Sequence, residues 1–576
     1  MRNVASGQQL FEHSRILVLA SLFFLFGAII AFRLFQLQVV QHHAYASLAS
    51  ASQEVYRDLF PERGSMYVRD GSSLFPVVTN REFYQVYAEP NKIQNVSSVI
   101  DAIVPVLGLT DEEWHALVPK LSVPDDPYEP IKSKVSKENV DRLSELAIPG
   151  IGFAPETYRY YPDKSLGGHI FGFLGVRNDE KVGQYGLEGY FNQQLAGTTG
   201  EARSFKDALG ALITVVPRSI REAQDGDDLV LTIDRQIQFQ ACAKLKQFFD
   251  SYQAESGTVI IMHPKTGAIL AMCSLPDFDP EHYSQVENIN VFNNPATFQA
   301  YEPGSVFKTL TMAAALDREK ITPETTYEDT GELKVGQYTI RNFDLQAYGT
   351  QTMTQALAKS LNLGAMHAAE QIGRVSFERY IKAFGFGERT GIELDSESPG
   401  NISNLSKPGD IFYLTGSYGY SITATPIQLA AAYAAIANNG LLIKPHVVAE
   451  RIDQNGNKYP TEQETIRQVI SRKTATILTG MLTEVVESSY DKKARVPGYY
   501  MAAKTGTARI PSGGGYSNET VHTIVGYGPV TNPEFVILVK IDKIKNGPVY
   551  ASDSVGPLFS QIAKFLVSYL ELPPDY

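Results

Sequence analysis

Apolar residues near the N-terminus form one long run. Residues 16–32 carry no charge and lie between Arg15 and Arg33. As a helix, these 17 residues would span roughly 26 Å, which is close to the hydrocarbon thickness of a bilayer. We therefore predict one membrane anchor within residues 16–37, with the folded part of the chain on the opposite side of the membrane from the short N-terminal tail.

A cleaved signal peptide is the rival interpretation of this run. Ala44, Tyr45 and Ala46 form a possible cleavage site of the A-x-A type. That site lies far beyond the apolar run, and the run is longer than the apolar part of a usual signal peptide. We therefore expect the segment to remain uncleaved.

Residues 38–225 mix short strand-like and helix-like patterns. Residues 84–88 are typical of a strand, and Thr110 followed by Glu113 predicts a capping box at the start of a helix. Catalytic residue types do not gather in this stretch. We expect it to form a non-catalytic platform.

From residue 226 the pattern changes to longer strands. Residues 228–234 predict a strand, and residues 236–249 predict an amphipathic helix. Two apolar strands, 257–263 and 268–274, flank a short turn and predict a hairpin.

The C-terminal end supplies a second pair of apolar strands. These cover residues 523–527 and 535–541, and residues 556–570 predict a final helix. Between the two ends, residues 280–495 have a mainly helical pattern. We therefore predict an α+β fold, in which an antiparallel sheet built from both ends of residues 226–576 is flanked by helices and carries a helical subdomain.

Composition excludes several classes of function. The 576 residues are too many for one compact core and suggest two folded domains. The net charge of −12 without a basic run argues against a nucleic-acid partner. The histidines form no metal-binding motif, so we predict neither a metal nor another cofactor. Cys242 and Cys273 could form one bridge or remain two buried thiols.

A serine and a lysine at helical spacing are the first candidates for chemistry. Pro303 and Gly304 interrupt the backbone, and an alanine-rich helix is predicted to start at Ser305. Lys308 lies three residues on, so its amine shares a helical face with the Ser305 hydroxyl. An alcohol needs a neighbouring base at neutral pH, and an amine can serve if burial or a second cation lowers its pKa.

Two further motifs follow, one in a helix-like run and one at the end of a strand-like run. Their residues are Ser360 and Asn362, and then Lys504, Thr505, Gly506 and Thr507. The order S-x-x-K, S-x-N, K-T-G resembles that of the penicillin-binding proteins and serine β-lactamases. Each motif alone is common, but three in this order are specific.

The resemblance implies roles for the first two motifs. Ser305 would attack the penultimate D-Ala carbonyl of a peptidoglycan stem peptide and form an acyl-enzyme, while Lys308 accepts its proton. Ser360 would relay a proton to the leaving amine. Asn362 would hold Lys308 and the substrate amide by hydrogen bonds.

The third motif would bind the substrate carboxylate. Lys504 and the hydroxyls of Thr505 and Thr507 are the implied ligands, and Gly506 would let the strand approach the ligand closely. We expect Lys504 to behave as an exposed side chain with little part in packing. The backbone N–H groups of Ser305 and Thr507 would form the oxyanion hole.

Residues before the catalytic stretch resemble the pedestal of class B penicillin-binding proteins. Residues 63–71 resemble the signature R-G-x-I-x-D-x-x-G, and residues 186–188 resemble the later G-x-E element. The resemblance implies a tail and anchor (residues 1–37), a dimerisation-type pedestal (38–225) and a transpeptidase domain (226–576).

As a whole, the chain resembles a D,D-transpeptidase of the septal (FtsI-type) branch, with the elongation branch as the alternative. The resemblance implies acylation by β-lactams and a catalytic domain in the periplasm or cell exterior of a bacterium. It also implies a membrane glycan polymerase and other division proteins as partners.

Glu397 leaves a hydrolytic alternative open. Glu397 to Asn401 spell E-x-x-x-N, about where class A β-lactamases carry their deacylating glutamate. The same residues also resemble a transpeptidase segment without such a role, and we predict that Glu397 belongs to a structural turn. A silent scaffold is a further alternative, against which the intact Ser305, Lys308 and Lys504 argue.

Overall fold

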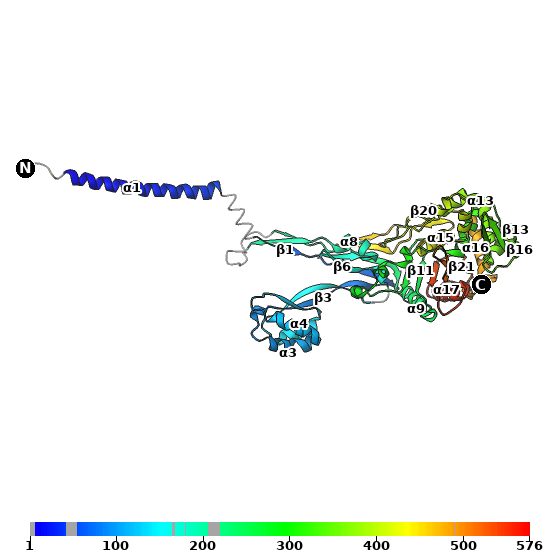
Figure 1. The fold of residues 1–576 in the computed structure, drawn as a ribbon, viewed down its shortest axis with the longest axis horizontal. Coiled ribbons are helices and arrows are strands. Elements are labelled where there is room, and N and C mark those ends of the chain that lie inside the picture. The colour runs from blue at the N-terminus through cyan, green and yellow to red at the C-terminus, as the bar shows by residue number, and fades with distance from the viewer. Residues whose placement is uncertain (1–5, 42–53, 164–166, 179, 206–218, 489) are drawn as a thin grey trace, which may run out of the picture. The chain divides into compact units, whose positions relative to one another are not determined.

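The computed structural model describes residues 6–41, 54–163, 167–178, 180–205, 219–488 and 490–576. Helix α1 (Ser6–Phe35) continues into a π-helical turn, η1 (Gln36–Val40) (Figure 1). The segment Leu17–Val40 has a mean hydropathy of 2.4 and is long and apolar enough to cross a membrane. The predicted anchor helix is therefore present. Ala44, Tyr45 and Ala46 lie outside the described residues.

The chain separates into two compact units. The first comprises residues 1–62 and 197–225, and the second comprises residues 63–196 and 226–576. In the first unit, an antiparallel sheet has the order β1-β8-β9. Its strands are β1 (Glu54–Leu59), β8 (Gly200–Phe205) and β9 (Ser219–Arg221).

The N-terminal part of the second unit is built on a mixed sheet. Its path is β19-β18-β10-β2-β3-β4, with β5 paired to β3. The strands are β2 (Met66–Asp70), β3 (Ser73–Ala88), β4 (Glu129–Val135), β5 (Ile151–Tyr160), β10 (Asp228–Asp234), β18 (Val448–Ile452) and β19 (Lys458–Pro460). Strand β10 belongs to the stretch after residue 226, so this sheet joins the platform and the catalytic stretch.

Three helices cover one end of this sheet and share an apolar core with β3 and β4. They are α3 (Val96–Leu107), α4 (Asp111–Leu121) and α5 (Lys137–Glu145). The predicted capping box is confirmed, because Thr110 Oγ1 accepts the Glu113 N–H at 3.2 Å and the Glu113 carboxylate accepts the Thr110 N–H at 2.8 Å. Smaller elements follow: α6 (Gly168–Phe171), β6 (Phe173–Arg177), β7 (Glu180–Gln184), α7 (Gly186–Tyr190) and α8 (Asn192–Ala196).

A buried cluster of charged residues lies in this part of the unit. Glu188 is completely buried, and its carboxylate accepts hydrogen bonds from Arg63 Nε and Arg159 Nε, each at 2.7 Å. Burial alone would raise the pKa of Glu188, but the two guanidinium groups outweigh it and hold that pKa below its ordinary value. Residues from three distant positions in the sequence are thereby held together.

The catalytic stretch contains a five-stranded antiparallel sheet in the order β12-β11-β23-β22-β21. Its strands are β11 (Ser256–Met262), β12 (Ile269–Leu275), β21 (Ala502–Ser512), β22 (Gly515–Gly528) and β23 (Phe535–Asp542). The predicted hairpin is β11–β12, and the predicted C-terminal pair is β22–β23. Because β11 pairs with β23, the prediction that both ends of the stretch build one sheet is confirmed.

Helices cover both faces of this sheet. Helices α9 (Arg235–Tyr252) and α17 (Ala551–Tyr569) share one apolar cluster with it. The other face packs against a helical subdomain that contributes to a second cluster. The helices of this subdomain are α10 (Pro295–Phe298), α11 (Lys308–Asp317), α12 (Met353–Ala358), α13 (Asn362–Ala383), α14 (Ile411–Gly416), α15 (Pro426–Ala437) and α16 (Arg472–Ser488). Short strand pairs connect them: β13 (Thr326–Asp329) with β16 (Gly349–Thr352), β14 (Glu332–Val335) with β15 (Tyr338–Arg341), and β17 (Leu441–Ile443) with β20 (Thr465–Gln468).

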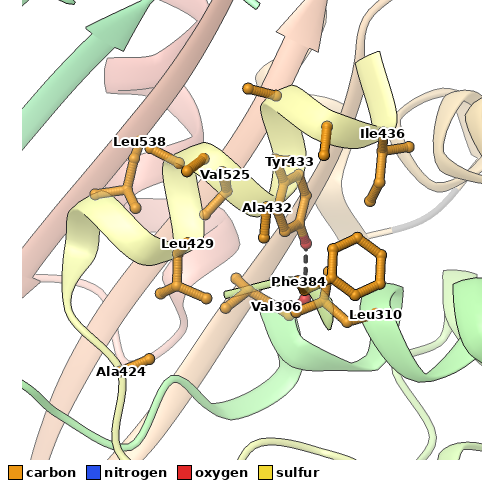
Figure 2. Close-up of a cluster of buried hydrophobic side chains, with 14 of the residues drawn as sticks. Val306, Leu310, Phe384, Ala424, Leu429, Ala432, Tyr433, Ile436, Val525 and Leu538 are labelled. Atoms are coloured by element: carbon orange, nitrogen blue, oxygen red, sulfur yellow. Dashed lines mark hydrogen bonds between the residues drawn. The ribbon is translucent and has the colours of Figure 1, made fainter. Parts of the chain in front are cut away.

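Helix α15 forms the centre of this packing. Figure 2 shows its apolar side chains between the sheet residues Val525 and Leu538 and the turn that contains Val306. The Tyr433 hydroxyl donates to the Val306 carbonyl at 2.7 Å. The buried helix therefore supports the turn that precedes α11 from behind.

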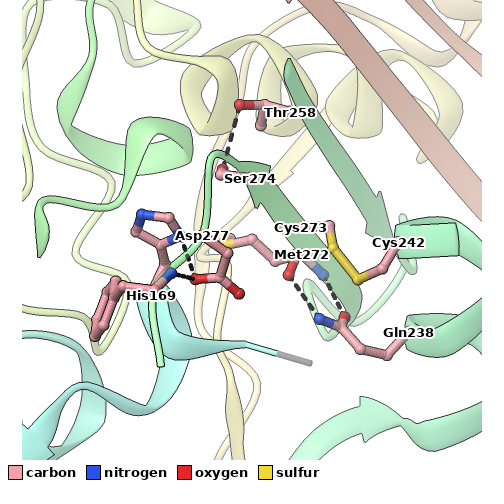
Figure 3. Close-up of a disulfide and its surroundings, with 9 residues drawn as sticks. His169, Gln238, Cys242, Thr258, Met272, Cys273, Ser274 and Asp277 are labelled. Carbon is pink, nitrogen blue, oxygen red and sulfur yellow. Dashed lines mark hydrogen bonds and ion pairs between the residues drawn. A yellow bond between two sulfur atoms is a disulfide. The ribbon is translucent and has the colours of Figure 1, made fainter. Parts of the chain in front are cut away.

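Cys242 and Cys273 form a disulfide, which decides between the two alternatives left open by the sequence. The bond joins α9 to strand β12, with a Cα–Cα distance of 5.6 Å (Figure 3). Beside it, the Gln238 side-chain amide forms two hydrogen bonds with the Met272 backbone, each at 2.8 Å. Helix α9 is thus fixed to the edge of the sheet.

Candidate active site

Ser305 lies in a short 3₁₀ turn, η5 (Gly304–Phe307), and α11 begins only at Lys308. The sequence predicted an α-helix from Ser305 itself. Gly304 has a φ of +61°, which favours glycine, and it is the first residue of this tighter turn. The Ser305 side chain remains partly exposed at a cavity, while the residues after it are buried.

Lys308 is buried at the start of α11. Its side chain is 1% exposed, and its Nζ donates to the Ser360 carbonyl at 2.5 Å and to Ser360 Oγ at 3.3 Å. Burial, and secondly the positive charge of Lys504, hold the pKa of Lys308 well below its ordinary value. The sequence analysis required either burial or a second cation to lower the pKa of an amine base, and Lys308 has both.

Ser360 lies at a break between α12 and α13, where the sequence predicted a continuous helix. Its φ of +59° is uncommon for a residue other than glycine and directs its carbonyl and hydroxyl to Lys308. Between these two described residues, the structure does not show the predicted hydrogen bond of Asn362 to Lys308. The Asn362 side-chain amide instead donates to the Arg341 carbonyl at 2.8 Å.

The third motif lies on β21, an edge strand of the sheet. Lys504 is near the start of this strand and is 1% exposed, so the expectation of an exposed side chain at a strand end was wrong. The helical subdomain covers this face of the sheet, which a local pattern cannot reveal.

Gly506 brings β21 against the nucleophile turn. A Cβ at this position would lie 2.9 Å from the Pro303 carbonyl oxygen and 3.2 Å from the Ser305 nitrogen. The sequence assigned this glycine to close approach of a ligand, whereas its described neighbours are backbone atoms of residues 303–306. The glycine therefore sets the distance between Ser305 and the strand.

The three motifs meet at a cavity of about 1680 Å³. Ligand pockets usually measure about 300–1,000 Å³, so there is room for more than one peptide segment. Six of the eight predicted site residues line it: Ser305, Ser360, Asn362, Lys504, Thr505 and Thr507. Lys308 and Gly506 lie behind this lining, where they contact Ser360 and the nucleophile turn.

Aromatic side chains in the lining were missed by the sequence analysis. Tyr418, Tyr420 and Tyr516 line the cavity together, and Phe343 and Tyr550 form an edge-to-face pair with ring centroids 5.7 Å apart. These residues come from four distant segments. Their shared position follows from the tertiary fold, which local patterns do not encode.

Glu397 is not among the cavity residues. Its carboxylate accepts hydrogen bonds from the Thr390 N–H and Oγ–H, both at 2.6 Å, and from the Gly391 N–H at 3.0 Å. The side chain is 8% exposed. The prediction that Glu397 belongs to a structural turn is confirmed.

Two family models match the chain. Residues 58–231 match a penicillin-binding protein dimerisation domain, and residues 257–564 match a penicillin-binding protein transpeptidase domain.

Similar proteins cover almost the whole chain. The stage V sporulation protein D of Bacillus subtilis is 31% identical over 558 residues, which are 96% of this chain and 85% of that protein. The peptidoglycan D,D-transpeptidase FtsI of Escherichia coli K12 is 26% identical, over 97% of this chain and 91% of that protein. The crystal structure of penicillin-binding protein 2X from Streptococcus thermophilus has a TM-score of 0.75 at 21% identity, covering 89% of this chain and 80% of that one.

Proposed function

This chain belongs to the class B penicillin-binding proteins and is a membrane-anchored, serine-type peptidoglycan D,D-transpeptidase, and from this premise we propose how its residues perform the reaction. The neutral amine of Lys308 accepts the Ser305 proton while Ser305 Oγ attacks the penultimate D-Ala carbonyl of a stem peptide. The negative oxygen that forms is stabilised by the N–H groups of Ser305 and Thr507. The close packing of Gly506 on the nucleophile turn supports this pairing.

Collapse of this intermediate breaks the peptide bond. The leaving D-Ala amine takes up a proton through the Ser360 hydroxyl, which lies 3.3 Å from Lys308 Nζ. An ester on Ser305 remains. The amine of a second stem peptide then attacks the ester carbon, passes its proton back along the same route, and releases Ser305 with a new amide bond between the two peptides.

The substrate carboxylate is held by the third motif. Lys504 supplies a positive charge, and the hydroxyls of Thr505 and Thr507 donate hydrogen bonds. All three residues line the cavity beside Ser305. Asn362 lines the same cavity and binds the substrate amide.

The observation that carries this mechanism is the burial of Lys308 against Ser360 and near a second cation. These surroundings favour the neutral amine, which can accept a proton from an alcohol. A penicillin reacts at the same serine, and its ester persists because Glu397, the residue suggested for hydrolysis, is bonded within its own turn.

Mass spectrometry after exposure to benzylpenicillin tests the assignment. The intact protein should gain one penicilloyl group, and peptide mapping should place it on Ser305. Ser305→Ala should gain none, whereas Ser403→Ala, an exposed serine of the same subdomain, should react like wild type. An adduct on another residue would overturn the mechanism.

We propose that the enzyme acts at the division septum, in company with a membrane glycan polymerase and other division proteins. The similarity to FtsI proteins supports this setting. The 31% identity to a sporulation protein favours a second candidate, cross-linking restricted to spore formation. Depletion in growing cells should produce filaments for a septal enzyme, rounded cells for an elongation enzyme, and normal growth with defective spores for a sporulation enzyme.

We also propose that residues 16–37 remain as an uncleaved anchor and that the catalytic domain lies outside the cytoplasm. The Cys242–Cys273 bond supports this side, because disulfides persist in oxidising compartments. Protease added to intact spheroplasts should digest the catalytic domain. Protection until the cells are lysed would contradict this orientation.

A further inference from the structure

The hydroxyl of Thr507 accepts a hydrogen bond from the first residue of α17. The Ala551 N–H donates to Thr507 Oγ1 at 3.0 Å. A hydroxyl group has one proton and two acceptor lone pairs. Since a lone pair takes the Ala551 N–H, the proton of Thr507 remains available to an acceptor on another side, and this side chain lines the cavity.

Ala551 is suited to polarise this hydroxyl. Helix α17 has 19 residues, and its N-cap residue Tyr550 provides no side-chain cap. The first N–H groups of a helix lack partners within the helix and carry its partial positive charge. A hydroxyl that accepts such a hydrogen bond becomes a stronger donor itself.

A buried histidine fixes the turn that contains Ala551. His522 is the cross-strand partner of Thr507 and is completely buried. Its Nδ1 lies 2.7 Å from Ser554 Oγ, and its Nε2 lies 3.0 Å from Thr520 Oγ1. Ser554 is also completely buried and lies in the first turn of α17. Strand β22 is thereby bonded to the turn that donates to Thr507.

The imidazole of His522 is neutral at physiological pH. Burial lowers its pKa to about 4, although the Asp542 carboxylate and the Val549 carbonyl oppose this shift. A neutral imidazole offers one donor and one acceptor, and both hydroxyl partners can adapt to either tautomer. The bond between strand and helix therefore does not depend on protonation of the imidazole near neutral pH.

We propose that His522 and Ser554 are positioning residues, which hold the first turn of α17 so that the Ala551 N–H orients the Thr507 hydroxyl toward the substrate carboxylate. This inference rests on the proposed role of Thr507 as a carboxylate ligand. It adds two residues outside the three motifs to the determinants of substrate selection.

The test compares two acylating agents that differ in one charge. Benzylpenicillin carries a carboxylate, and its methyl ester presents the same ring without that charge. The ratio of their acylation rate constants on full-length protein measures the preference for the carboxylate. Because both rates come from one preparation, any inactive fraction cancels from the ratio.

Thr507→Val should lower this ratio roughly 10-fold or more, as expected for loss of a hydrogen bond to a charged group. Ser554→Ala and His522→Phe should each lower it several-fold. Ser560→Ala is the matched control, since Ser560 also lies in α17 and its hydroxyl donates to the Arg495 carbonyl at 2.6 Å; this variant should leave the ratio unchanged.

Two results would overturn the inference, and they are distinguishable. If Ser554→Ala and His522→Phe slow both agents equally while Thr507→Val lowers the ratio, the pair only stabilises the fold and Thr507 keeps its proposed role. If Thr507→Val itself leaves the ratio unchanged, the proposed role of Thr507 fails, and this inference fails with it.

Discussion

The pedestal and the catalytic site each bury charged side chains, but they balance the charge differently. In the pedestal, the carboxylate of Glu188 lies between Arg63 and Arg159 and bonds to both. The cluster contains opposite charges in direct contact, and the two guanidinium groups hold the pKa of Glu188 below its ordinary value. The carboxylate of Glu188 therefore stays ionised, and the cluster holds distant segments of the chain together.

In the catalytic site, Lys308 is equally buried but bonds to the neutral oxygens of Ser360, with Lys504 as a second positive charge nearby. These surroundings disfavour the protonated amine. The contrast teaches that a buried charge matched by its opposite destabilises the fold when one partner is removed, whereas a buried amine bonded to neutral oxygens is more often unprotonated at neutral pH and can accept a proton.

Replacing the site lysine should have the largest effect, and it should act on rate. In Lys308→Met, a side chain of similar length loses the base, so we expect acylation by benzylpenicillin to fall roughly 10²–10⁴-fold. Thermal stability should not fall comparably, because a costly buried amine is removed. The exposed Lys320 at the end of the same segment provides the control Lys320→Met. Acylation by Lys308→Met within a few-fold of wild type would exclude Lys308 as the base.

Breaking the pedestal cluster should instead act on stability. Glu188→Ala leaves two buried guanidinium groups without their shared partner, which should lower the free energy of unfolding by about 3–5 kcal/mol. Urea unfolding followed by circular dichroism measures the change. The exposed Glu145→Ala should stay within about 0.5 kcal/mol of wild type. The acylation rate per folded molecule should not change, and a selective loss of rate would show that the cluster takes part in the reaction.

Replacing Glu397 should have the smallest effect on stability and on acylation, and it distinguishes a transferase from a hydrolase. In Glu397→Gln the amide can no longer accept from both the Thr390 donors and the Gly391 N–H, so stability should fall by about 1–3 kcal/mol. The lifetime of the penicilloyl-enzyme should stay within a few-fold of wild type. Rapid turnover of a chromogenic cephalosporin by wild type that is abolished in Glu397→Gln would place the protein among the hydrolases.

The elements that local patterns specify were predicted well. The β11–β12 hairpin follows from two apolar runs around a short turn, and the capping box at Thr110 follows from residue types three positions apart. The three motifs also identified residues that the fold brings together around one cavity. In these cases, the determining interactions lie within a few residues or within a motif of known order.

The errors share a different cause. The run around Ser360 has a helical pattern, but its positive φ accompanies a hydrogen bond from Lys308, 52 residues away. Lys504 is charged, yet it is buried, because its strand packs against α16 and against the distant turn η5. The pairing of Glu188 with Arg63, which the sequence analysis did not predict, spans 125 residues. Tertiary contacts of this kind override local preference, and no local pattern encodes them.

The pH dependence of acylation tests most directly whether the surroundings of Lys308 lower its pKa enough for its amine to act as the base. Its pKa is lowered from the ordinary 10.5 by burial and by Lys504, so the amine loses its proton at a pH well below 10.5. The rate constant for acylation of Ser305 by a labelled penicillin should therefore be level over the alkaline range and fall only as pH is lowered through the reduced pKa. A rate that keeps rising tenfold per pH unit until near 10.5 would show an ordinary lysine and contradict the account.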